Sequence, residues 1–212
     1  NAGIILDLNE GTLANGAQGL IATPGTLLLR QLGMVDNSVG GEISSDRAFT
    51  LAANTLNNQG GRLISSEALT LRIAKTLDNS LKGQVLATDG LAIESQVLDN
   101  RAGTIGSKGD ARISVTSLDN AEQGSLVSEG RLELVADQVS NGNQGRIAAR
   151  GVLEAAVGTL LQQGGELVSQ GSLDLRADML DNSQSGLIAA NGGIAIEAVS
   201  YTHLRAHETR GN

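Results

Sequence analysis

The chain has 212 residues, 28 of them Gly, no Cys and a formal net charge of −8. Only Phe49 and Tyr201 are aromatic, whereas an ordinary globular core of this size uses several large aromatic side chains. The acidic balance and the three scattered Lys disfavour nucleic acid as a partner. Without Cys there is neither a disulfide framework nor a thiolate metal site. No run of 18 apolar residues occurs, so we expect no membrane span.

A single repeat organises residues 1–199. Glycine recurs every 20 to 22 residues, at Gly19, Gly41, Gly61, Gly83, Gly103, Gly124, Gly145, Gly165 and Gly186. Aliphatic residues stand two and eight positions after each of these glycines, and five or six positions before it, in nearly every copy. Nine copies keep this register, which is the sequence signature of a solenoid.

Apolar and polar residues alternate within each copy, as in residues 132–136 and 173–177. A period of two predicts a strand with one face turned inward. We therefore predict an all-β fold, a right-handed single-stranded parallel β-helix of about nine coils and roughly 21 residues per coil. Each coil is expected to hold two or three short strands. A leucine-rich repeat fits less well, because the short Leu-x-Asn to Gly step leaves no room for a helix.

Amide residues follow the third aliphatic column by two positions. They are predicted to stack as a structural ladder at one corner of the coil, and Asn also tolerates the left-handed backbone that a corner needs. The column consists of Asn15, Asn37, Asn58, Asn79, Asn100, Asn120, Asn141 and Asn182, with Gln162 in the eighth copy. Ligand contact is the alternative role for these side chains.

Acidic residues precede many of these amides, and Asp78, Asp99 and Asp119 fall on adjacent coils. Stacked about 4.8 Å apart, they could bind Ca²⁺ together with backbone carbonyls or serve as a glycosidase pair. The favoured interpretation is structural: each Asp caps a backbone N–H at its corner. The tripeptide 108–110, Lys-Gly-Asp, is similar to integrin-binding tripeptides, but the repeat itself explains its Gly.

The pattern resembles the haemagglutinin repeat of filamentous haemagglutinins and contact-dependent inhibition exoproteins. Four Leu-Asp-Asn steps, at 77–79, 98–100, 118–120 and 180–182, carry the resemblance, and residues 124–134 complete one copy. It covers about residues 4–199. It implies a two-partner secretion protein of a Gram-negative bacterium, exported through an outer-membrane transporter and displayed as a rod at the cell surface or secreted.

The last segment, residues 200–212, does not follow the repeat. Its string SYTHLRAHET resembles the translation of sequencing-adaptor read-through, so we expect these residues to be non-native. Both His residues lie there, which leaves residues 1–199 without a Ser-His-Asp arrangement or a His metal site.

These observations favour a structural function without catalysis or cofactor. The segment is expected to be a fragment of a rod that projects a distal binding or toxic domain of an adhesin or toxin-carrying exoprotein. A receptor on a host or neighbouring cell is an open partner. The alternative is a β-helix enzyme, a lyase or hydrolase acting on polysaccharide, which would normally interrupt the repeat with long loops.

Overall fold

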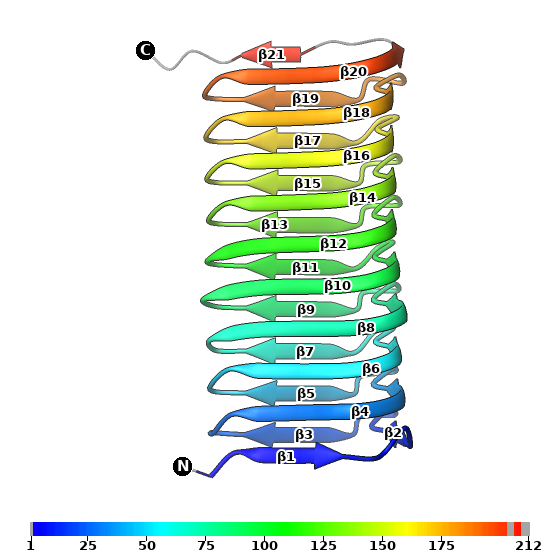
Figure 1. Ribbon diagram of the computed structural model, residues 1–212, viewed down its shortest axis with the longest axis vertical. Coiled ribbons are helices and arrows are strands. Elements are labelled where there is room, and N and C mark those ends of the chain that lie inside the picture. The colour runs from blue at the N-terminus through cyan, green and yellow to red at the C-terminus, as the bar shows by residue number, and fades with distance from the viewer. Residues whose placement is uncertain (1, 203–205, 209–212) are drawn as a thin grey trace.

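The computed structural model describes residues 2–202 and 206–208. The chain coils around one axis and forms a rod, and its strands stack into two parallel sheets that run along the rod (Figure 1). The first sheet has 11 strands: β1 (Ile4–Asp7), β2 (Thr12–Ala14), β4 (Leu27–Asp36), β6 (Phe49–Asn57), β8 (Ala68–Asp78), β10 (Gly90–Asp99), β12 (Asp110–Asp119), β14 (Leu132–Ser140), β16 (Leu153–Leu161), β18 (Leu173–Asp181) and β20 (Ile194–Thr202). The second has 10 shorter strands: β3 (Leu20–Thr23), β5 (Glu42–Ser45), β7 (Arg62–Ser65), β9 (Gln84–Ala87), β11 (Thr104–Ser107), β13 (Ser125–Ser128), β15 (Arg146–Ala149), β17 (Glu166–Ser169), β19 (Leu187–Ala190) and β21 (Ala206–Glu208).

Each coil consists of one short strand, a corner, one long strand and a second corner. The coils from β3–β4 to β19–β20 number nine within the described residues, and each long strand pairs in parallel with the next, as Leu91 with Ala111 and Leu98 with Leu118 in β10 and β12. The predicted all-β parallel solenoid is thus confirmed, with its number of coils and its period. The second and third aliphatic columns share one bent strand, so a coil has two strands. Right-handedness stays a prediction.

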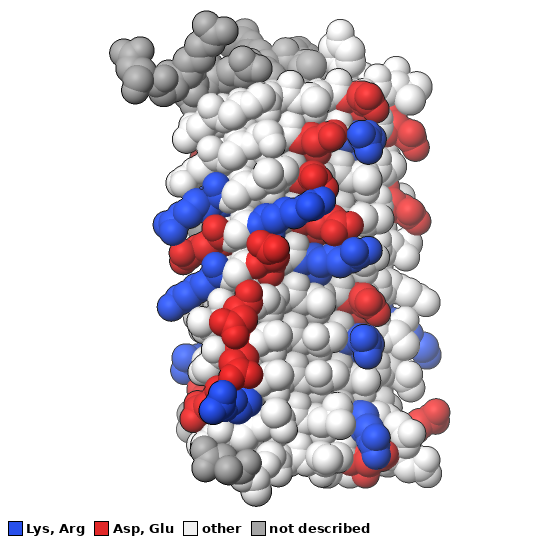
Figure 2. All heavy atoms as spheres, turned by 60° about the vertical axis from the view of Figure 1, so that its left-hand side comes forward, with Lys and Arg blue, Asp and Glu red and all other residues white. Residues whose placement is uncertain are grey.

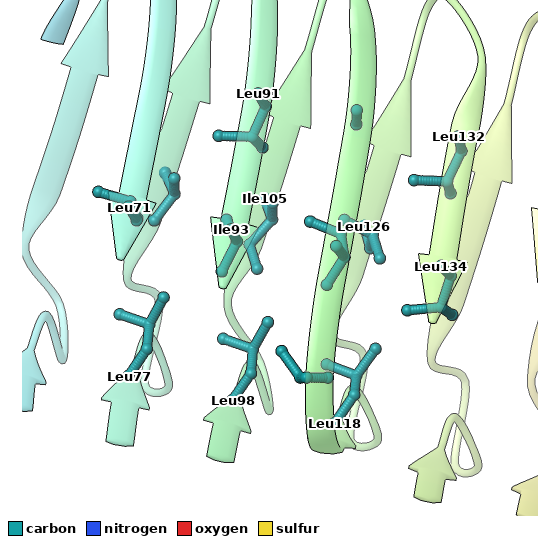
Figure 3. Packing of buried hydrophobic residues seen from close by; sticks show 14 of the residues in the cluster. Leu71, Leu77, Leu91, Ile93, Leu98, Ile105, Leu118, Leu126, Leu132 and Leu134 are labelled. Atoms are coloured by element: carbon teal, nitrogen blue, oxygen red, sulfur yellow. The ribbon is translucent and has the colours of Figure 1, made fainter. Parts of the chain in front are cut away.

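The interior is a thin stack of aliphatic side chains. Figure 3 shows Leu71, Ile93 and Leu134 of the long strands and Ile105 and Leu126 of the short strands pointing into the space between the two sheets. All five are 0–1% exposed. Burying one such side chain contributes about 1.5–3 kcal/mol, and every coil repeats the contribution. The columns found in the sequence are therefore the core.

Length differences between copies are absorbed at two places: at the bend of the long strands, and at the amide corner, where three or four positions separate the ladder amide from the repeat glycine. The pairings of β4 with β6, β6 with β8 and β8 with β10 shift register at the bend. Gln31, in the bend of β4, has a φ of 53°, a left-handed conformation that bulges often need. Inserted residues thus leave the flanking columns in register.

The strand pairing extends past the predicted boundary at residue 199. β20 continues to Thr202, with Leu180 opposite Tyr201, and β21 pairs with β19. Tyr201 is 62% exposed, so it does not fill the core column that Leu180 fills one coil earlier. The non-native origin of residues 200–212 stays a prediction, and residues 203–205 and 209–212 lie outside the described part of the chain.

Candidate functional site

The amide column forms a continuous hydrogen-bonded ladder inside one corner. The Nδ2 of Asn15 donates to the Oδ1 of Asn37, and each following Asn donates to the amide oxygen of the next coil as far as Gln162, over 2.6–2.9 Å. From Asn37 to Gln162 these side chains are 0% exposed. No ligand from solvent can reach them in this conformation, so the ladder is a structural element.

Every rung also binds the backbone of the next coil. The Nδ2 of Asn79, for example, donates to the carbonyl oxygen of Thr104 at 3.2 Å as well as to Asn100 at 2.7 Å. A buried amide without partners would cost about 1–3 kcal/mol. Because all donors point toward the following coil, each coil is bonded to its successor by a side chain in addition to the strand pairing.

The repeat glycine is required by the ladder. A Cβ on Gly103 would lie 2.1 Å from the carbonyl oxygen of Asn79 and 2.6 Å from the Oδ1 of Asn100. A Cβ on Gly165 would lie 1.8 Å from the carbonyl oxygen of Asn141. Neither glycine has a positive φ, so close packing of the backbone against the amides explains the conserved spacing of the column within this chain.

The left-handed backbone expected of the ladder Asn residues is not present. Positive φ angles occur one or two residues before the repeat glycine instead, as at Leu81 (52°) and Lys82 (71°), while Asn79 keeps a negative φ. The corner is closed by a hydrogen bond from the Gly83 N–H to the Ser80 carbonyl at 3.0 Å. Asn is thus used here for its amide, and that part of the prediction was wrong.

The acidic column caps the same corner. The Oδ1 of Asp78 accepts a hydrogen bond from the N–H of Ser80 at 3.0 Å, and that of Asp119 accepts one from Ala121 at 3.1 Å. Five Asp of the column make this contact with the residue two positions on: Asp36, Asp78, Asp99, Asp119 and Asp181. This is the Asx turn that Asp favours at corners.

Calcium binding at this column receives no geometric support. The guanidinium of Arg101 contacts Asp99 at 2.6 Å and Asp119 at 3.5 Å, so a protein cation already occupies the space between these carboxylates. Among the described residues no group of three or more His, Cys, Asp or Glu side chains is placed to hold a metal ion. Asp181, at the end of the column, has its pKa lowered by hydrogen bonds from the side chain and backbone of Ser183.

A second polar column, at the opposite corner, was not assigned a role from the sequence. Ser45, Ser65, Ser128 and Ser169 are buried. The hydroxyl of Ser128 donates to the Gly109 carbonyl of the preceding coil at 2.8 Å. Its oxygen also accepts from the N–H of Gly130 at 3.2 Å. The signal was present, because a Ser stands four positions after the repeat glycine in these copies.

The Lys-Gly-Asp tripeptide lies within this corner. A Cβ on Gly109 would lie 1.5 Å from the Asp89 carbonyl oxygen, and the Asp110 carboxylate accepts a hydrogen bond from the N–H of Arg131 at 2.8 Å. Packing between coils therefore accounts for both residues.

Outward charges are paired between coils. All ten Arg side chains that the structure describes make an ion pair. Most pairs join neighbouring coils, such as Arg62 with Glu42 at 3.1 Å and Arg150 with Glu129 at 2.9 Å. Figure 2 shows acidic and basic side chains lying beside one another along one side of the rod. Each exposed pair contributes about 0–1 kcal/mol.

The comparisons with known proteins agree with this architecture. The family model described as haemagglutinin repeat matches residues 1–80, 72–136, 112–177 and 168–200. The chain belongs to the haemagglutinin repeat family. Members of this family are typically secreted or surface-exposed, and the repeat is in general non-enzymatic. Neither a curated protein nor a solved structure matches the chain. Within the described residues of this haemagglutinin repeat segment, no helix is long and apolar enough to cross a membrane.

Proposed function

We propose that this haemagglutinin repeat segment is a stiff spacer in the rod of an adhesin-type bacterial exoprotein, and that it holds a distal binding or toxic domain away from the cell. The observation that carries the proposal is the continuity of the contacts along the axis. Two sheets, the aliphatic core and the amide ladder all run from coil to coil, so bending the rod would break several of them at once.

Dimensions support the same role. Nine coils at about 4.8 Å each give a length of about 40 Å for this segment, and added copies lengthen a solenoid without changing its cross-section. The proposed export route, a two-partner pathway through an outer-membrane transporter of a Gram-negative cell, comes from the family resemblance. A receptor for the segment itself remains a separate proposal.

The polysaccharide-acting enzyme is the weaker candidate. A β-helix enzyme builds its cleft from long loops, whereas the described corners between adjacent strands of this chain are short. No His lies in residues 1–199. The surface of the rod is regular, and within these residues no nucleophile can be paired with an imidazole base.

Replacement of the segment tests the spacer function. In the exported protein that carries it, residues 19–186 are exchanged for an unrelated β-solenoid of equal length, or for a flexible Gly/Ser linker of equal residue number. We expect adhesion or toxin delivery to survive the first exchange and to fall with the second. Loss of activity in both would show that this surface itself binds a partner, and retention in both would contradict the need for stiffness.

A further inference from the structure

A shallow groove runs along the outer bend of the long strands β14, β16, β18 and β20. Its volume is about 850 Å³, and it is widely open to solvent. Its floor is apolar, with Val135, Ala156 and Val157 among its residues, and its polar side chains are Asp137, Arg176, Asp178 and Glu197.

One position in the lining of the groove, Gly158, carries no side chain. Asp137, Gly158 and Asp178 hold equivalent positions in three successive coils, each between the paired residues of neighbouring strands. A Cβ on Gly158 would lie 2.6 Å from the Asp137 carbonyl oxygen, so the backbone itself keeps this position free of a side chain. Asp137 and Asp178 thus flank a position without a side chain, and their backbone positions are about 10 Å apart at two strand spacings.

These two carboxylates differ from most outward acids of the rod. Asp137 and Asp178 make no ion pair within the described residues, although every described Arg is paired. The one cation of the groove, Arg176, already contacts Asp174 at 3.6 Å and Glu197 at 3.3 Å. Three carboxylates against one guanidinium leave the groove with an excess charge of −2.

We propose that this groove is a docking surface for an extended, basic polypeptide segment, whose Lys or Arg side chains pair with Asp137 and Asp178 on either side of Gly158. Charge complementarity selects the basic side chain, and the apolar floor accepts its methylene stem or neighbouring small apolar residues. The floor carries no aromatic ring, which disfavours a sugar. The contacts are exposed, so the binding is weak and weakens further with salt.

The test uses the 212-residue chain and a fluorescein-labelled octapeptide of alternating Arg and Ala, at low ionic strength. Fluorescence anisotropy gives the affinity, and amide chemical shifts locate the contact. The double variant Asp137→Asn with Asp178→Asn is expected to bind about ten-fold more weakly. The matched control, Asp89→Asn with Glu122→Gln, removes the same charge outside the groove and should retain affinity.

A second variant, Ala156→Arg, fills the groove from an exposed position and should abolish binding while leaving the thermal unfolding midpoint unchanged. Shift changes confined to β14, β16, β18 and β20 support the proposal. If both double variants lose affinity equally, overall charge explains the binding, and the proposal is overturned. Absence of binding by the unmodified chain, or equal binding of a Gln-for-Arg peptide, would overturn it as well.

Discussion

The Nε2 of Gln162 donates to the carbonyl oxygen of Leu187 at 3.4 Å and does not reach the amide of Asn182 in the next coil. Among the described residues, neither polar atom of the Asn182 side chain has a hydrogen-bond partner, although this side chain is only 3% exposed. The extra methylene of Gln moves the amide out of register. The ladder therefore ends between the eighth and ninth coils.

Gln162→Asn should extend the ladder by one rung. The shorter side chain can donate to the Oδ1 of Asn182, and the gain is expected to be about 1 kcal/mol in the free energy of unfolding. Urea denaturation measures the change, with Gln170→Asn, an exposed position, as the control. Hydrogen exchange at β18 and β20 should slow as well. A destabilised Gln162→Asn chain would contradict the role assigned to the missing rung.

Asn100→Ala should interrupt the ladder at its centre. The substitution leaves the Oδ1 of Asn120 without its donor, and an unsatisfied buried group costs about 1–3 kcal/mol. The Nδ2 of Asn79 loses its ladder partner but keeps the carbonyl oxygens of Gly83 and Thr104. Asn54→Ala, at an exposed position of the bend, is the control and should change the free energy of unfolding by less than about 0.5 kcal/mol. Equal effects from the two substitutions would show that the ladder adds nothing.

Gly103→Ala should destabilise the rod through a backbone clash. Its Cβ would lie 2.1 Å from the Asn79 carbonyl oxygen, whereas a Cβ on Gly90 would lie 3.7 Å from its nearest neighbour, the Asp110 carbonyl oxygen. We expect a loss of at least about 2 kcal/mol for the first and little change for Gly90→Ala. Thermal unfolding followed by circular dichroism compares the two. Similar unfolding midpoints for Gly103→Ala and Gly90→Ala would mean that the corner accommodates a Cβ without loss of stability.

Asp181 should make part of the stability dependent on pH. Its pKa is lowered by hydrogen bonds with Ser183 and with Gln163, so the folded state favours the ionised form. This contribution is fully present above the unfolded-state pKa of about 3.9 and is lost as the pH falls through the lower folded-state pKa.

Asp181→Asn keeps an acceptor for the Ser183 N–H but removes the titration. Denaturation curves between neutral pH and pH 2 should therefore be less steeply pH-dependent for this variant. Asp89→Asn, whose carboxylate makes no hydrogen bond within the described residues, serves as the control. If both variants keep the full acid dependence, the stabilisation does not come from Asp181.

The sequence by itself determined the repeat, the aliphatic columns and the position of the amide column, because identical side chains at a fixed period can be buried together only by stacking identical coils. Leu77 and Leu98 illustrate this: the period alone places one above the other, and the strands pair them. The same reasoning placed the Asp residues at a corner.

Only the tertiary structure decided how the coils contact one another. Three findings depend on contacts between neighbouring coils: the presence of Arg101 between Asp99 and Asp119, the need for Gly103 beneath the ladder, and the missing rung at Gln162. In each of them a shift of a few tenths of an ångström decides whether two atoms bond or clash. A period fixes which residues are neighbours. It does not fix where their polar atoms lie, because one methylene, as in Gln162, moves an amide out of hydrogen-bonding range.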